Sequence, residues 1–146
     1  MQNNQTPKAP VTFAKDWAGF ETQTPPESFQ KLETTARSEA TLVIPGNTEV
    51  SEIQRLLSDS PPKAVAIEFE TFRNGQGYSL ARLLKREPWF QVPLIASGDI
   101  LVDQIFYLWR CGFDHFILRE DQSLELAEAA LSSFTHVYQS AERMTP

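Results

Sequence analysis

Short apolar runs alternate with segments whose apolar residues recur every three or four positions, and this alternation fills the chain beyond residue 40. The runs predict strands and the periodic segments predict helices. The predicted strands are residues 41–44, 64–69, 93–97 and 116–118, and the predicted helices are residues 50–57, 78–86, 100–111 and 124–138. Parallel strands need crossover connections, which are usually helices. We therefore predict a single α/β domain of four βα units with a mostly parallel sheet.

Two architectures share this local pattern, because it does not contain the order of the strands. A flavodoxin-like open sheet is favoured on length, since half of a (βα) barrel leaves sheet edges and apolar surface that need a partner. The half barrel is the alternative, and a homodimer could complete its sheet. We assign residues 1–40 to an N-terminal arm that is partly mobile, residues 41–140 to the α/β domain and residues 141–146 to a tail.

Charge and composition exclude several classes of function. A net charge of −6 argues against nucleic acid, whose binding needs clustered Lys and Arg. The chain has no apolar run long enough to span a bilayer and no pattern of a signal peptide, so we expect a cytoplasmic protein without a membrane partner. One cysteine, Cys111, and two histidines supply no cysteine-based metal or iron–sulfur site. We predict no metal and no cofactor, and a buried Cys111.

The segment between the second predicted strand and its helix is the candidate ligand site. Ligands of open α/β sheets bind beyond the carboxyl ends of the strands. Two glycines before a helix could direct backbone N–H groups at sulfite, sulfate or phosphate, with a hydroxyl, an arginine and an aspartate nearby. The candidate ligand-binding residues are Asn74, Gly75, Gln76, Gly77, Ser79, Arg82 and Asp99. The segment lacks the third glycine of a dinucleotide site and the lysine of a P-loop, so a structural turn with Ser79 as helix cap is favoured.

A polar and aromatic stripe is predicted along the helix at residues 100–111. Asp99, Asp103, Phe106 and Arg110 follow one another at intervals of four, three and four residues. We expect Asp99 to cap this helix. Tyr and Trp are enriched in protein interfaces, although core packing is their commoner role. The candidate interface residues are Asp103, Trp109 and Arg110.

Three ordered segments carry a resemblance to a known family. Residues 69–85, 95–104 and 110–114 resemble the bacterial family called domain of unknown function 934. Members of that family are usually encoded beside assimilatory sulfite reductase and are described as probable oxidoreductases of sulfite reduction. The resemblance therefore implies a role in sulfur assimilation, with sulfite reductase or its electron donor as a partner. It implies no established catalytic residues.

The chain departs from the usual pattern of that family at five positions: Glu70, Arg73, Asn74, Gln76 and Ile95. These departures change the charges around any anion site in the glycine segment. We therefore expect an accessory protein of sulfite reduction that acts by protein contact or by binding an anion. The alternative is an oxidoreductase or other enzyme that holds an anionic substrate between Asn74 and Ser79.

Overall fold

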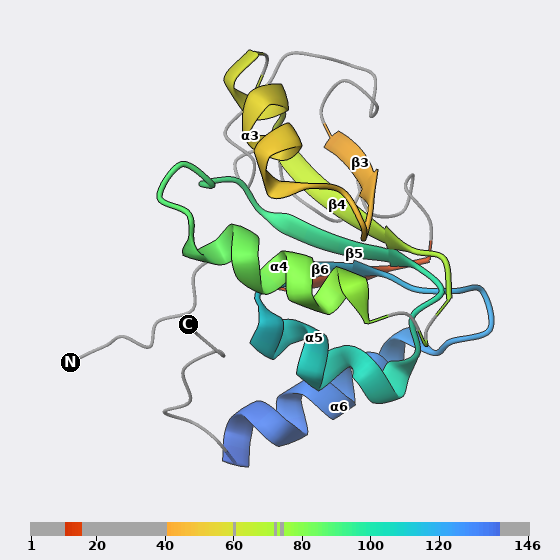
Figure 1. Ribbon diagram of the computed structural model, residues 1–146. Helices are drawn as coiled ribbons and strands as arrows, with labels where there is room; N and C mark the ends of the chain where they lie inside the picture. The colour runs from red at the N-terminus through yellow and green to blue at the C-terminus, as the bar shows by residue number, and fades with distance from the viewer. Residues whose placement is uncertain (1–10, 16–40, 60, 72, 74, 138–146) are drawn as a thin grey trace.

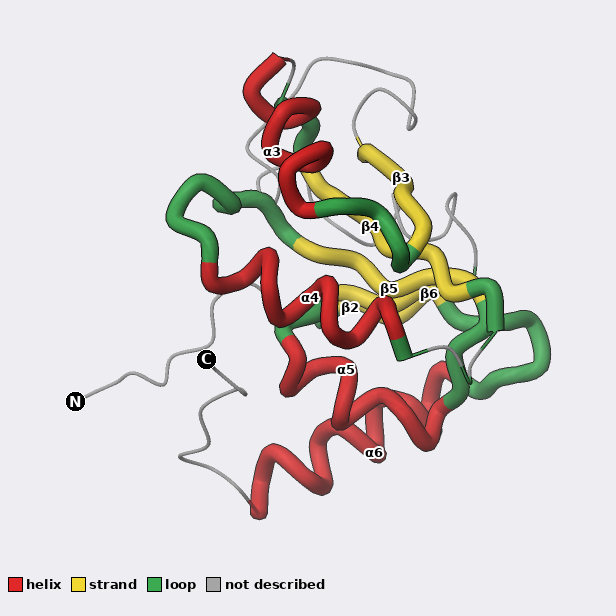
Figure 2. The backbone as a smooth tube through the Cα atoms, viewed as in Figure 1, coloured by secondary structure: helices red, strands yellow, loops and turns green. Residues whose placement is uncertain are grey.

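The structure is a computed structural model that describes residues 11–15, 41–59, 61–71, 73 and 75–137 (Figures 1 and 2). The strands are β2 (Thr12–Ala14), β3 (Thr41–Pro45), β4 (Ala64–Phe69), β5 (Leu94–Gly98) and β6 (His115–Ile117). The helices are α3 (Val50–Asp59), α4 (Gln76–Arg86), α5 (Ile105–Cys111) and α6 (Leu124–Val137), with a 3-10 turn, η2 (Val102–Gln104), before α5. Each predicted strand and helix is present, with shifts at several ends.

The strands form one five-stranded sheet in the order β2-β6-β5-β4-β3, and every pair is parallel. This confirms the predicted α/β class and its open, parallel sheet. From β3 to β6 each strand lies beside the next one along the chain. Because βα crossovers are right-handed, consecutive steps in one direction place the connecting helices on the same face. The pattern of apolar residues did not predict β2, which pairs with β6.

The two faces of the sheet bury different kinds of side chain. Toward the helices, residues from every strand, most of them large, join one core: Phe13, Ile44, Val65, Ile67, Phe69, Leu94, Ala96 and Phe116. The helices contribute Ile53, Leu57, Leu80, Leu84, Ile105 and Leu108 to the same core. The opposite face buries a smaller cluster of Ala14, Ala64, Ala66, Ile95 and Ile117. Ile95, one of the departures from the family pattern, is therefore a buried residue of the sheet.

The helices lie in chain order across the helical face of the sheet (Figure 1). α4 contacts α3 on one side and α5 on the other, and α5 also contacts α6. The carboxyl ends of β3 and β4 lead into the starts of α3 and α4, so their two connecting loops lie at the same edge of the sheet. None of the helices in the described ranges combines the length and apolar character needed to cross a bilayer.

Candidate functional site

The glycine segment starts helix α4 instead of forming a loop around a ligand. Gly75 is the N-cap, and its φ of −87° and ψ of −1° lie in the right-handed helical region, which residues other than glycine also adopt. Helix α4 begins at Gln76, two residues before the predicted start, so Gly77 and Ser79 lie inside the helix. The prediction that Ser79 caps this helix is wrong, because its backbone N–H already donates to the Gly75 carbonyl oxygen within the first turn.

Gly77 is required by packing and not by a turn. A Cβ atom at this position would lie 2.5 Å from the ring of Phe69, which ends β4. A Cβ atom on Gly46 would lie 2.9 Å from the backbone nitrogen of Gly77. The two glycines therefore let the loop after β3 and the first turn of α4 approach each other closely, above the end of the sheet.

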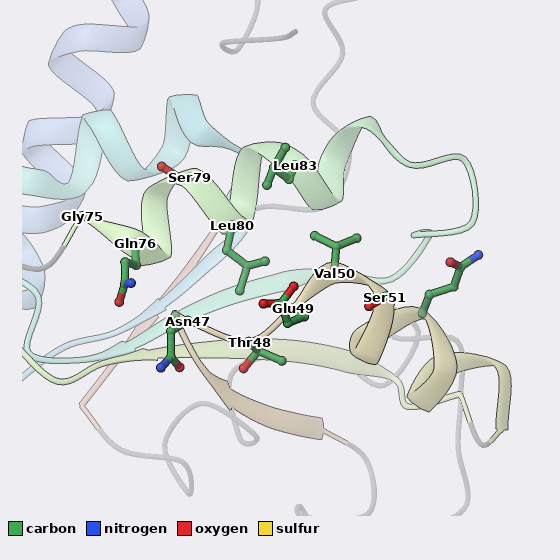
Figure 3. A pocket seen from close by; sticks show the side chains of 12 residues that line it. Asn47, Thr48, Glu49, Val50, Ser51, Gly75, Gln76, Ser79, Leu80 and Leu83 are labelled. Carbon is green, nitrogen blue, oxygen red and sulfur yellow. The ribbon is translucent and has the colours of Figure 1, made fainter.

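An open pocket of about 970 Å³ lies between α3 and α4 (Figure 3). One wall consists of residues 46–51 and 54, from the β3–α3 loop and α3. The other wall consists of Gly75, Gln76, Ser79, Leu80 and Leu83, from the start and one side of α4. The loop after β3 is held as a turn, since the backbone N–H and the hydroxyl of Thr48 both donate to the Pro45 carbonyl oxygen (3.2 and 2.7 Å).

The α4 wall of the pocket is polar at one end and apolar farther along, whereas the α3 wall also carries the polar residues Ser51 and Gln54. Figure 3 shows the amide side chains of Asn47 and Gln76 near the end of the sheet, with Leu80 in the middle and Leu83 farther along α4. Among the described residues that line the pocket, Glu49 is the only one with a charged side chain. The electrostatic environment of the pocket is therefore set by one carboxylate and by the amino ends of two helices.

The structure gathers only part of the predicted ligand site at this pocket. Gly75, Gln76 and Ser79 line it, and Gly77 lies beneath the first turn of α4. Asn74 lies outside the described residues. Arg82 and Asp99 are not part of the lining, and each has contacts elsewhere.

Asp99 lies at the carboxyl ends of the central strands and not at the start of a helix. Its backbone N–H donates to the Phe69 carbonyl oxygen (2.8 Å), and its Oδ1 accepts a hydrogen bond from Nη1 of Arg119 (2.6 Å). Arg119 also pairs with Asp121 (2.6 Å), and its hydrogen bonds lower the pKa of the Asp121 carboxyl. Asp99 is therefore one member of a surface ion-pair cluster.

The prediction that Asp99 caps the helix is wrong, because the chain takes a different course after β5. Gly98 adopts a φ of 93°, and the first helical turn begins only at Val102. Leu101 occupies the cap position, where its backbone N–H donates to Oε1 of Gln104 (2.8 Å). Asp99 and Asp103 are four residues apart, but Asp99 lies before the first helical turn, so the two side chains do not share one face of a helix.

Arg82 faces α5, on the side of α4 opposite the pocket. It contacts Cys111, the last residue of α5, whose side chain is only 1% exposed. Burial raises the pKa of this thiol, and the hydrogen bond with Tyr107 and the charge of Arg82 oppose the rise. The prediction that Cys111 is buried is confirmed, and its raised pKa disfavours the nucleophilic thiolate.

The outer side of α5 gathers aromatic side chains around an arginine. The rings of Phe106 and Trp109 are stacked with their centroids 6.1 Å apart, and the guanidinium carbon of Arg110 lies 5.7 Å from the Phe106 centroid. Tyr107 is 41% exposed. Asp103, in η2, is also exposed, so the three predicted interface residues lie on or beside this short helix. We call Phe106, Tyr107, Trp109 and Arg110 the α5 aromatic surface.

Sequence reasoning missed the α3 wall of the pocket, which includes Asn47, Glu49 and Gln54. In the sequence, Pro45 and Gly46 indicate only that the first strand ends there. The position of this wall beside the glycine segment depends on the pairing of β3 with β4, which the sequence did not reveal. The described ranges contain no group of three or more His, Cys, Asp or Glu side chains that could hold a metal ion.

Comparison with known proteins gives one match. No curated protein and no solved structure matches the chain. A family model described as "Bacterial protein of unknown function (DUF934)" matches residues 41–146, which includes the pocket and the α5 aromatic surface. Because the match covers more than half of the chain, this protein belongs to the DUF934 family of bacterial proteins of unknown function.

Proposed function

We propose that this protein is an accessory protein of assimilatory sulfite reduction that acts by contact with sulfite reductase or with its electron donor. Membership of the DUF934 family supports the pathway, through the association that the sequence resemblance implies. The mode of action is inferred from one surface of the structure.

The α5 aromatic surface is the observation that carries the proposal. Tyr, Trp, Phe and Arg are enriched in protein interfaces, and Trp, Tyr and Arg are enriched among the residues whose truncation costs the most binding energy. On α5, Ile105, Leu108 and Cys111 are buried, whereas the three aromatics and Arg110 keep part of their surface exposed: Phe106 and Trp109 pack at the border of the core, and Tyr107 lies beside the ring of Tyr78. The stacking of Phe106 with Trp109 and Arg110 holds these side chains in a fixed arrangement, which lowers the entropy cost of binding.

Affinity purification tests this proposal with a matched pair of variants. The tagged protein is recovered from its native host, grown on sulfate as sulfur source, under mild salt. Tyr107→Ala removes an exposed aromatic of the α5 surface, and the control Leu126→Ala removes a side chain of α6 that is 62% exposed. We expect the wild type and Leu126→Ala to recover reductase subunits or the electron donor, and Tyr107→Ala to recover at least about fivefold less.

Two results would contradict the contact proposal. One is that the wild type recovers neither partner. The other is that Tyr107→Ala and Leu126→Ala recover equal amounts of it. Thermal melting of both variants shows whether a loss of binding reflects unfolding instead of a lost contact.

The second candidate is an enzyme that holds an anionic substrate at the start of α4. The placement of Gln76 and Ser79 in a pocket at a helix amino end favours it. A thermal-shift series with sulfite, sulfate, phosphate, flavin and nicotinamide nucleotides tests it, because a ligand of the native state raises the melting temperature. If none of these compounds at millimolar concentration raises the melting temperature, this candidate fails.

A further inference from the structure

The pocket between α3 and α4 is separate from the α5 aromatic surface. No residue of α5 is among the described residues that line it, and α4 lies between the two regions. Its volume of about 970 Å³ is that of pockets that hold small molecules. It lies beyond the carboxyl ends of β3 and β4, which is where βα loops commonly form ligand sites.

Along α4 the lining changes from polar to apolar, which matches a ligand with two chemically different ends. Asn47 and Gln76, at the end near the sheet, carry amide groups that can both donate and accept hydrogen bonds. Farther along, Leu80 and Leu83 give the α4 wall an apolar surface, and Leu83 is 43% exposed in spite of its size. An aliphatic group placed against Leu83 would remove that surface from water, which is favourable.

The charges around the pocket nearly cancel. α3 has 10 residues and α4 has 11, and both helices begin at the pocket. Each amino end is equivalent to about half a positive charge, so the two together are about equal and opposite to the carboxylate of Glu49. An anion gains from the helix ends but meets Glu49, whereas a cation gains from Glu49 but meets the helix ends. A charged ligand therefore loses hydration without a net electrostatic gain, whereas an uncharged ligand loses much less hydration.

We propose that the pocket between α3 and α4 binds, in place of an anionic substrate, an uncharged small molecule that has amide or hydroxyl groups at one end and an aliphatic group at the other, and that Glu49 offsets the attraction of the two helix ends for anions. Asn47 and Gln76 hydrogen-bond the polar end of the ligand, and Leu80 and Leu83 contact its aliphatic group. Glu49 sets the charge specificity of the pocket.

Three probes of similar shape and different charge test the specificity. N-acetyl-leucinamide is neutral, and N-acetyl-leucine is an anion. Leucinamide is a cation at about pH 6.5, because its amino group has a pKa of about 8. Each is titrated into the isotope-labelled full-length protein while backbone amide signals are followed by NMR. We expect the neutral probe to shift the signals of Asn47, Gln76 and Leu83 at millimolar concentration, and each charged probe to bind at least about threefold more weakly.

Two variants locate the binding and its charge dependence. Leu83→Asn should abolish the shifts caused by the neutral probe, whereas Leu126→Asn, on exposed α6, should keep them. Glu49→Gln should raise the affinity for N-acetyl-leucine about twofold to fivefold and change the affinity for N-acetyl-leucinamide less than twofold, because only the anion is freed from repulsion.

The proposal is overturned if none of the three probes shifts signals around the pocket, or if the anion binds the wild type as tightly as the neutral probe does. An unchanged ratio of anion to neutral affinity in Glu49→Gln overturns the role of Glu49. Equal binding by Leu83→Asn and Leu126→Asn overturns the location.

Discussion

The two sides of α4 differ in how completely they are filled. Toward α5, Nε2 of Gln104 donates to the hydroxyl oxygen of Tyr78 (2.5 Å), and the rings of Tyr78 and Tyr107 lie 5.0 Å apart. Cys111 completes this side and is almost fully buried. Toward α3, the same helix borders an open pocket, and Leu83 keeps 43% of its surface exposed.

This difference arises from the size of the side chains that meet at each side. The α5 side brings together two tyrosines, a glutamine and a cysteine, which fill the space between the helices. The α3 side brings together small or polar residues, such as Gly46, Ser51, Gly75 and Ser79, which leave space. In a closely packed region, shortening a buried side chain leaves a cavity and lowers stability. We infer that the α5 side of α4 contributes mainly to stability, and that the α3 side is available for a ligand.

Replacing one leucine on each side tests this division with the largest expected effect. Leu108, on α5, is fully buried, so Leu108→Ala should lower the free energy of unfolding by about 2–5 kcal/mol. Leu83→Ala, on the pocket side, should lower it by less than about 1 kcal/mol, because a half-exposed side chain leaves no sealed cavity. Urea denaturation measures both. Similar losses in the two variants would contradict the division.

The glycines at the start of α4 give an intermediate effect. Gly77→Ala should destabilise the protein by about 1–3 kcal/mol, because the new methyl group meets the ring of Phe69 at 2.5 Å. Gly75→Ala is the control, since nothing lies within 4 Å of a Cβ atom there. We expect its effect to stay within about 0.5 kcal/mol, because the gain from a stiffer unfolded chain opposes the poorer helix cap. If both variants have the same stability, the close contact with Phe69 does not govern this position.

Local patterns predicted the elements well where the apolar period was clear. Strand β4 has the predicted limits, Ala64–Phe69, because an apolar run that is interrupted only at Glu68 is closed by Lys63 and Glu70. The start of α4 was placed two residues late, since Gly77 has no side chain to contribute to the period and fits for a reason of packing against Phe69. Strand β2 was missed because it is three residues long and its partner, β6, lies about a hundred residues away along the chain.

The candidate site was predicted only in part, for a related reason. The glycine segment provides one wall of the pocket, and its residues Gln76 and Ser79 were recognised from the sequence. The other wall comes from the loop after β3, and only the order of the strands places it there. Arg82 was assigned to the site because it lies one helical turn beyond Ser79, and Asp99 because it follows the third predicted strand at the same rim of the sheet. Arg82 faces α5, and Asp99 follows β5 and pairs with Arg119, whereas the pocket lies between α3 and α4.

The hydroxyl of Tyr78 gives the smallest effect, and it probes the filled side of α4 alone. Burial, followed by the nearby Cys111 and Tyr107, raises the pKa of Tyr78 from 10.0 to about 12. The unfolded chain therefore loses this proton at a lower pH than the folded protein does. The resulting stabilisation is fully present below pH 10 and is lost as the pH rises toward about 12.

Tyr78→Phe should lower the free energy of unfolding at neutral pH by about 0.5–1.5 kcal/mol, because it removes the hydrogen bond from Gln104. The stability of this variant should also fall less steeply at alkaline pH than that of the wild type, because phenylalanine lacks the hydroxyl group whose pKa is raised in the folded protein. Leu83→Ala is the control on the open side, and it should keep the alkaline slope of the wild type. Urea denaturation at a series of pH values between about 8 and about 11.5 measures these slopes, because this interval spans the pKa of a tyrosine in the unfolded chain, about 10. An identical slope in Tyr78→Phe and the wild type would mean that Tyr78 is not shielded from water, and the α5 side of α4 would then be no more closed than the α3 side.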